Sequence, residues 1–283
     1  MIIHVVMTCH NRRDHTVKSL SALRACLEKS SLEASIHLCD DGSTDGTAEA
    51  VTSSWPTAHI LQGDGSFYWA KGMRVAEDHA RGSASPSDLM LWLNDDTELA
   101  EDSLQRLVDC LNRHPRSIVV GTTVADSASS ESTYGGMVRN GLHPLRYRLI
   151  GVTDADTSVD AMNGNIVLQT VETSTALGGI DGNFSHAWAD IEYAHRARAS
   201  GREVIVAPGS HGRCSRNPPA PRLNFAKSWE RFRSVKGAGN PSSLKRLLQA
   251  VRPRTWPFFF LWSYIGFVVR WTVGAARPGK LSA

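Results

Sequence analysis

The chain has 283 residues, of which 41% are hydrophobic, 7% aromatic and 21% charged, and its net charge is +3. This composition excludes intrinsic disorder, collagen and coiled coil, and the length suits one large domain or a core domain with an appendage. Five widely spaced cysteines without a CxxC pair argue against a disulfide framework or a zinc knuckle and favour a reducing compartment, so we expect a cytoplasmic protein.

The first 121 residues alternate between apolar runs and amphipathic segments. Residues 2–9 are apolar, precede the first basic residues and lack a small-residue cleavage site, so we expect a buried strand and not a signal peptide. Asp14 is the expected N-cap of the helix that follows. The pattern predicts further strands at 36–39, 58–61, 89–93 and 117–121, and helices at 15–30, 47–55, 70–80 and 101–112. This order predicts a doubly wound, Rossmann-like α/β fold with a mostly parallel sheet and helices on both faces.

After about residue 125 the alternation is lost. Clusters of Ser and Asp flank short strand candidates at 136–140, 143–151 and 164–171, which indicates a more open, mixed region. A helix is expected at 189–201, closed by Gly201, and a last short strand at 204–208. The sequence contains no internal repeat and no long low-complexity linker.

Acids and amides follow three of the predicted strands. They are Thr8 to Asn11, Asp40-Asp41 and Asn94-Asp95-Asp96. A single Asp at a strand end is usually a turn or a helix cap, but three such ends at one edge of a parallel sheet predict a negative, ligand-binding crevice. Such a crevice binds Mg²⁺ or Mn²⁺ bridged to a diphosphate. Neither GxGxxG after the first strand nor GxxxxGK[ST] is present, so the chemistry depends on acids and a cation.

Several segments together resemble a known family. VVMTCHNR, LCDDGSTDGT, LNDDTEL and ALGGIDGNFSHAWADIEYAHRARASG resemble the GT-A-fold, family 2 glycosyltransferases, and QGDGSFYWAKGM is similar to the rhamnosyltransferase-like subset. The resemblance covers roughly residues 1–216. It implies transfer of a sugar from a UDP-, dTDP- or GDP-linked donor to an acceptor hydroxyl, with inversion at the anomeric carbon. It also implies a glycosyltransferase domain with a nucleotide-sugar half (1–121) and an acceptor half (122–216), before a helical extension (217–283).

The resemblance assigns roles position by position. Nucleotide and donor binding falls to Thr8, Asn11, Asp40, Asp41, Trp69, Gly72 and Asp95, and the acceptor side to Gly179, Asp181 and Trp188. Asp96, in the DxD-type motif, and His211, after the last strand, are the implied contacts of the Mn²⁺ or Mg²⁺ ion. Asp190 is the implied catalytic base. The family often has Glu-Asp there, whereas this chain has Ala189-Asp190.

The proposed chemistry needs these residue types, although each has an ordinary structural alternative. An inverting transfer requires a base close to the acceptor hydroxyl, and a divalent ion offsets the charge on the leaving nucleoside diphosphate. Asp190 is equally placed to cap its helix, and a lone histidine such as His211 is usually structural. Trp69 and Trp188 suit either stacking on a sugar or packing in the core. The remaining expectations are an i,i+4 pair of Glu192 with Arg196 and burial of Cys9 and Cys39.

The charge is unevenly distributed along the chain. Residues 211–283 hold 14 Lys or Arg and one acid, whereas residues 1–210 hold 17 basic and 27 acidic residues. Residues 256–276 are 21 in number, about 31 Å as a helix, and eight of them are Trp, Phe or Tyr. Arg270 and Pro257 argue against a membrane span. Peripheral attachment to the anionic inner face of the membrane is favoured, with a packed helix or a dimer interface as alternatives.

These features predict a metal-dependent inverting glycosyltransferase of bacterial surface polysaccharide or cell-wall synthesis, with a glycan or lipid-linked acceptor. Homo-oligomers are compatible with the tail, and no nucleic-acid partner is expected, because its readers interleave basic and aromatic residues. One alternative is a sugar-phosphate nucleotidyltransferase, which usually carries a Gly-rich, basic signature after the first strand. The other is a non-catalytic relative that binds nucleotide sugars.

Overall fold

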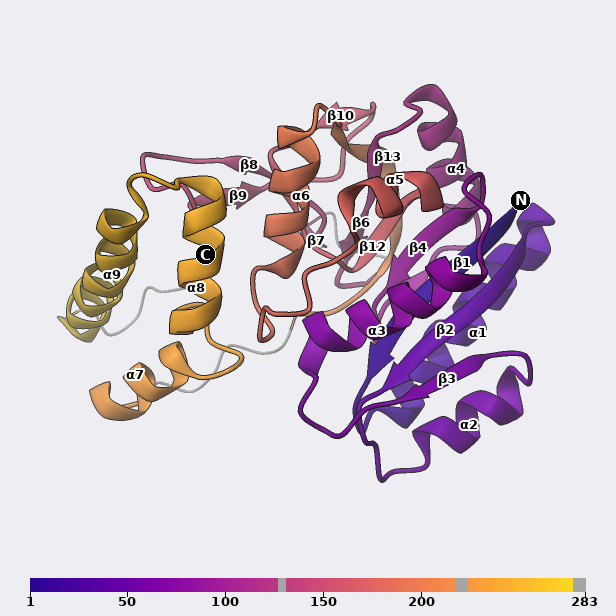
Figure 1. Ribbon diagram of the computed structural model, residues 1–283, viewed down its shortest axis with the longest axis horizontal. Coiled ribbons are helices and arrows are strands. Elements are labelled where there is room, and N and C mark those ends of the chain that lie inside the picture. The colour runs from indigo at the N-terminus through magenta and orange to yellow at the C-terminus, as the bar shows by residue number, and fades with distance from the viewer. Residues whose placement is uncertain (127–130, 217–222, 277–283) are drawn as a thin grey trace.

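The strands of the described chain form two sheets. The structure, a computed structural model, describes residues 1–126, 131–216 and 223–276 (Figure 1). The larger sheet contains β1 (Ile2–Cys9), β2 (Glu33–Asp40), β3 (His59–Gln62), β4 (Leu89–Leu93), β5 (Glu98–Leu99), β6 (Ile118–Val124), β7 (Ser132–Tyr134), β10 (Thr157–Ser158), β12 (Ile166–Thr170) and β13 (Val204–Arg213). The smaller sheet contains β8 (Gly136–Arg139), β9 (Tyr147–Leu149) and β11 (Ala161–Met162).

The larger sheet has the strand order β10-β13-β6-β12-β4-β1-β2-β3, with β5 beside β13 and β7 beside β6. The four strands β3, β2, β1 and β4 are parallel, as the alternating pattern predicts. β12 lies between β4 and β6 and runs antiparallel to both. The doubly wound α/β fold is therefore confirmed. Its departures are the reversed strand β12 at the centre, which the sequence indicated only as a candidate in the mixed region, and the antiparallel pairings of β5 and β10 with β13 and of β7 with β6.

Helices cover both faces of the larger sheet. They are α1 (Arg13–Ser30), α2 (Thr47–Ser54), α3 (Tyr68–Ser83), α4 (Ser103–Arg113), α5 (Val171–Leu177) and α6 (Ala189–Ala199). Successive residues of a strand face opposite sides, so Val5 and Met7 pack with α1, α2 and α4, whereas Val6 packs with α3, α5 and α6. The second of these cores contains the buried Trp92, whose ring lies 4.7 Å from that of Tyr193.

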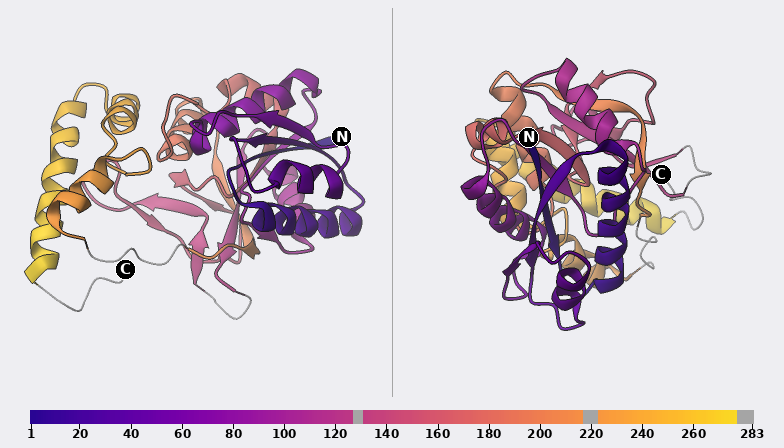
Figure 2. Two further views of the ribbon diagram at one scale, coloured as in Figure 1. Left: turned by 90° about the horizontal axis from the view of Figure 1, so that it is seen from below. Right: turned by 90° about the vertical axis from the view of Figure 1, so that its right-hand side faces the viewer.

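The helical C-terminal extension is confirmed. Its helices are α7 (Phe225–Arg233), α8 (Pro241–Val251) and α9 (Trp256–Ala276), and they form the end of the molecule farthest from the N-terminal strands (Figures 1 and 2). α8 buries Leu247 and Val251 in the same core as α6. No helix within the described ranges is long and apolar enough to cross a membrane. Residues 217–222 and the basic end, 277–283, lie outside the described residues.

The N-cap prediction for α1 is wrong. The helix begins at Arg13 with Arg12 in the cap position, and Asp14 lies in its first turn, bonded to the side chain of Arg13. The backbone N–H of Arg13 donates instead to the carboxylate of Asp45, at 3.0 Å. A residue of the loop after β2 therefore supplies the acceptor that the sequence assigned to Asp14.

Four histidines pack together where β1, β2, β3 and α3 meet. His37 is fully buried, and its ring nitrogens lie 3.0 Å from Nδ1 of His4 and 2.9 Å from Nδ1 of His79. The ring of His59 stacks on it at 5.1 Å. Burial, and after it the charges of the three neighbouring histidines, lower the pKa of His37 to about 3. The only carboxylate paired with the cluster in the described chain is that of Asp88, 3.6 Å from Nε2 of His4.

This cluster makes the fold sensitive to acid. The unfolded chain binds a proton at His37 below pH about 6.5 and the folded chain does not, so folding stability falls by about 1.4 kcal/mol for each pH unit below that value. His37→Phe should flatten this dependence, as measured by urea unfolding between pH 8 and 5. His15→Phe, at an exposed position of α1, is the control and should leave the slope unchanged. Parallel curves for the wild type and His37→Phe would contradict the prediction.

Candidate active site

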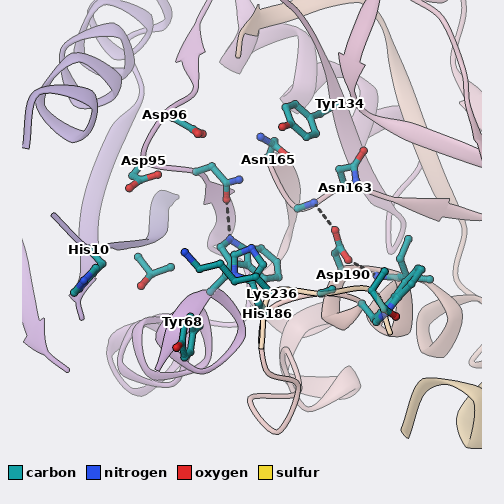
Figure 3. A pocket seen from close by; sticks show the side chains of 18 of the residues that line it. His10, Tyr68, Asp95, Asp96, Tyr134, Asn163, Asn165, His186, Asp190 and Lys236 are labelled. Carbon is teal, nitrogen blue, oxygen red and sulfur yellow. Dashed lines mark hydrogen bonds between the residues drawn. The ribbon is translucent and has the colours of Figure 1, made fainter. Parts of the chain in front are cut away.

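A pocket of about 900 Å³ lies at the carboxyl ends of β1 and β4 (Figure 3). Its walls come from segments far apart in the sequence: the end of β1, the loop after β4, the loop before β12, the start of α6 and the segment between α7 and α8. Seven residues singled out in the sequence line it: Thr8, Asp41, Trp69, Asp95, Asp96, Trp188 and Asp190. The other six, Asn11, Asp40, Gly72, Gly179, Asp181 and His211, are not among its lining residues.

Asp41 holds one wall of the pocket in place. Its side chain is buried, and its carboxylate accepts the backbone N–H groups of Gly65, Phe67 and Tyr68 at 2.9, 3.1 and 2.9 Å. These bonds fix the loop that leads into α3, including Tyr68, whose φ is +53°. Gly63 lies so close to Asp41 that a Cβ there would stand 2.6 Å from Oδ1. The carboxylate therefore orders the nucleotide side of the site through the backbone.

Asn11 and Asp40 support the loops behind this wall. The Asn11 carboxamide oxygen accepts the N–H of Thr44 at 2.8 Å, and the Asn11 N–H donates to the hydroxyl of Ser43. Asp40 is buried and accepts the N–H of Ser43 at 3.0 Å. Asn11 therefore ties the loop after β1 to the loop after β2, and Asp40 orders the loop after β2 from within.

Thr8, Gly72 and Trp69 determine how α3 lies against the sheet. A Cβ on Gly72 would stand 2.2 Å from the hydroxyl of Thr8, so glycine permits the close approach of α3 to β1. The Trp69 indole N–H donates to the side chain of Asn94 at 2.8 Å, and its ring meets Trp92 edge-on. Trp69 both packs against the core and lines the pocket.

Asp95 and Asp96 share one cation. The Arg12 guanidinium lies 2.8 Å from a carboxylate oxygen of Asp96 and 3.4 Å from one of Asp95. Burial raises the pKa of Asp95 to about 7, Arg12 opposes this effect and the neighbouring Asp96 adds to it. The thiol of Cys214, at the other side of Asp96, lies 3.4 Å from its second oxygen. The two carboxylates therefore make this corner of the pocket suited to a positive charge.

Asp190 lies across the pocket from this pair, at the start of α6 (Figure 3). Its carboxylate accepts the N–H of Ile191 at 2.8 Å and that of Gly164 at 3.2 Å. Burial raises its pKa to about 6, although both backbone bonds lower it. Asp190 thus contributes to the helix start and also presents a partly buried carboxylate to the pocket.

The acceptor-side residues hold the loops around α6 and α8. Trp188 has a φ of +83°, and its indole N–H donates to the carbonyl of Ala238 at 2.9 Å. The Asp181 carboxylate pairs with Arg246 of α8 at 2.5 Å. The carbonyl of Gly179 accepts from Arg196, which also forms the expected pair with Glu192.

His211 is placed away from the pocket. Its side chain is buried near Arg106 and Asp102, where burial lowers its pKa to about 3 and the charge of Arg106 lowers it further. β13 continues well beyond the predicted strand at 204–208, with register shifts on both sides of Ser210. A regular alternation of faces therefore does not hold at this end of the strand. Cys9 and Cys39 are buried, as predicted.

Several pocket residues escaped the sequence analysis. They are Arg12, Tyr68, Tyr134, Asn163, Asn165, His186 and Lys236. All lie at element ends or in loops that meet only in the folded chain. The sequence offered one indication for Arg12, because this residue lies within the motif that follows the first strand. It offered no indication for Lys236, which belongs to the extension.

Residues 4–169 match the family model described as "Glycosyl transferase family 2". The chain belongs to this family. It is a glycosyltransferase of the rhamnosyltransferase-like type, and the match argues against both a nucleotidyltransferase and a non-catalytic relative. The glycosyltransferase is 21% identical over 231 residues to the N-acetylglucosaminyl-diphospho-decaprenol L-rhamnosyltransferase of Mycobacterium tuberculosis, a match covering 74% of each chain.

Solved structures confirm the GT-A fold of this glycosyltransferase. Residues 1–349 of TarS from S. aureus superpose with a TM-score of 0.58 at 13% identity, over 97% of this chain and 92% of that one. The mannosyltransferase PcManGT from Pyrobaculum calidifontis, in complex with GDP-Man and Mn²⁺, gives a TM-score of 0.55 at 16% identity, over 99% of this chain and 76% of that one.

Proposed function

We propose that the protein is a metal-dependent, inverting glycosyltransferase that moves a sugar from a nucleotide-diphosphate donor to a lipid-linked glycan in cell-wall or surface-polysaccharide synthesis. The observation that carries the proposal is the partly buried carboxylate of Asp190, which lies across one pocket from Asp95 and Asp96 (Figure 3). One wall is suited to a charged donor, and the other supplies a base.

The donor side is the wall formed by Thr8, the Asp41 loop and Asp95. The ordered loop and its aromatic residues provide a fixed surface for a base and a ribose. UDP-, dTDP- and GDP-linked sugars are all candidates, and the complex of PcManGT with GDP-Man supports a nucleotide-sugar donor. The M. tuberculosis relative, by its name an L-rhamnosyltransferase, supports a deoxyhexose as the transferred sugar.

The pocket fits a divalent ion that the donor helps to bind. Mg²⁺ and Mn²⁺ usually take one or two carboxylates from a protein and further oxygens from phosphates and water. Asp96, with Asp95 beside it, would hold the ion, and the ion pairs of both carboxylates with Arg12 support a cation at this place. Among the described residues no group of three or more His, Cys, Asp or Glu is arranged as a metal site, and His211 lies elsewhere. When bound, the ion supplies charge neutralisation at the leaving diphosphate.

Asp190 accepts the proton of the acceptor hydroxyl. With a pKa of about 6 it is mostly ionised at neutral pH, and its burial makes it more basic than a carboxylate in water. The Gly164 and Ile191 N–H groups hold the carboxylate in one orientation. The hydroxyl then loses its proton as the new glycosidic bond forms on the face opposite the leaving group.

The face of α9 that points away from the protein suits a membrane surface. Phe258, Leu261, Ile265 and Val269 recur at helical spacing and are each more than half exposed. The exposed Leu142, in the loop after β8, extends this face, because the next residue, His143, packs against Phe259 and Trp262. The excess of basic residues in the extension complements anionic lipid. An acceptor with a lipid anchor, such as the relative's name describes, would meet the enzyme there.

The ion site is tested by Asp96→Asn. Mn²⁺ with the preferred nucleoside diphosphate should stabilise the wild type by about 2.7 kcal/mol at 100 times Kd, seen as a higher melting temperature. The amide carries no charge for the ion, so the metal-dependent part of the rise should disappear in the variant. Asp154→Asn, at an exposed loop position outside the pocket, is the matched control. An equal rise in both variants would show that Asp96 is no metal ligand.

The base is tested by Asp190→Asn. Turnover should fall by about 10² to 10⁴, because the amide takes up no proton, while nucleoside diphosphate binding persists. In the wild type, kcat/KM should fall about tenfold per pH unit below pH about 6, as Asp190 becomes protonated. Glu192→Gln, the same change two residues further along α6, should keep turnover. Full activity of Asp190→Asn would remove the assigned base.

Membrane attachment is tested by placing charge on the apolar face. The wild type should float with vesicles that contain anionic phospholipid and much less with neutral vesicles. The double variant Leu261→Glu, Ile265→Glu should lose this binding, because two carboxylates face the lipid. Val152→Glu, at an exposed apolar position outside the extension, is the control. Flotation of the double variant at the wild-type level would be incompatible with attachment through α9.

A further inference from the structure

The segment between α7 and α8 forms part of the pocket wall. Lys236 and Ala238 line the pocket, although they come from the extension (Figure 3). Two hydrogen bonds hold the segment, one on each side of Lys236 in the sequence. The Trp188 indole N–H and the Ser185 hydroxyl donate to the carbonyls of Ala238 and Val235, each at 2.9 Å. The site therefore remains incomplete without residues that follow the family match at 4–169.

Lys236 is a cation without an acidic partner in the described part of the chain. Its ammonium lies 5.9 Å from the centre of the Tyr68 ring, over the donor side of the pocket. On the other side it faces His186, whose pKa is lowered by burial and then by the charge of Lys236. The second strong cation of the pocket, Arg12, is already paired with Asp95 and Asp96. Of these two cations, Lys236 is therefore the one that remains available to bind an anion.

We propose that Lys236 binds the diphosphate of a substrate, so that the extension supplies a specificity-determining residue to the pocket. The inference rests on the proposed function, which brings two diphosphates to this site: one on the nucleotide donor and one on a lipid-linked acceptor. A lysine ammonium is a compact point charge on a flexible stem, with three donors that suit phosphate oxygens.

The position of Lys236 is consistent with either diphosphate. Tyr68 begins α3 on the donor side, whereas His186 lies in the acceptor half, two residues before Trp188. The wall segment also rests on α9, because the hydroxyl of Tyr264 donates to the carbonyl of Gly239 at 2.7 Å. The segment that carries Lys236 is therefore in direct contact with α9, the helix to which we assign the lipid surface.

The test compares Lys236→Ala, Lys236→Arg and Lys227→Ala in the full chain. Lys227 is an exposed lysine of α7 outside the pocket, so its variant controls for loss of charge in the extension. The donor arm measures the Kd of UDP, dTDP and GDP with Mn²⁺. The acceptor arm measures the Kd of farnesyl diphosphate, with farnesol as the probe that lacks the diphosphate.

Lys236→Ala should raise the Kd in one arm by about tenfold or more, as expected for the loss of a charge-assisted hydrogen bond. Lys236→Arg keeps the charge and should bind nearly as tightly as the wild type. Weaker nucleotide binding identifies the donor diphosphate, and weaker farnesyl diphosphate binding with unchanged farnesol binding identifies the acceptor diphosphate. Values within twofold of the wild type in both arms, from a wild type that binds nucleotide and transfers sugar, would overturn this inference alone. A wild type that neither binds nucleotide nor transfers sugar would overturn the proposed function together with it.

Discussion

The Asp41 carboxylate is the contact on which the donor side of the site depends. It is buried at the end of β2 and accepts three backbone N–H groups from the loop that leads into α3. Without it, those three donors would lose their partners in a half-buried place, at about 1–3 kcal/mol each. Because it fixes where α3 begins, it also fixes the contact of Gly72 with Thr8 and the bond of Trp69 to Asn94. A single carboxylate thus orders one wall of the pocket through its hydrogen bonds to backbone N–H groups.

A second buried carboxylate joins the two halves of the enzyme. Glu77 of α3 accepts the hydroxyl of Ser174 at 2.6 Å and the N–H of Ile180 at 2.7 Å, and burial raises its pKa. Arg196 of α6 donates to the carbonyls of Leu177 and Gly179 in the same loop. The loop with Gly179 and Asp181 is therefore held by α3, α6 and, through Arg246, α8. These residues position the loop before α6 against α3 and α8.

The sequence was informative wherever a short stretch carries its own pattern. The alternating strands and helices up to residue 121, the bounds of α9 and the acids at the ends of β1, β2 and β4 follow from local spacing. What it missed depends on distant partners. β12 enters between β4 and β6 through pairings that no local run indicates, and Asp45 caps α1 from 32 residues away. The register shifts in β13 near His211 also depend on pairing with distant strands. Lys236 likewise lines the pocket only because the folded extension packs beside it.

The order of elements in the extension ties two tasks to one piece of chain. The wall segment, α8 and α9 follow one another directly, and the aromatic rings of Phe232 and Phe267 stack at 4.3 Å to join α7 to α9. A truncated enzyme that ends at residue 216 would keep the family motifs and both groups of acids, yet it would lack a wall of its pocket. Removal of the extension would therefore change the pocket itself, whereas point substitutions on the outer face of α9 would leave the pocket whole.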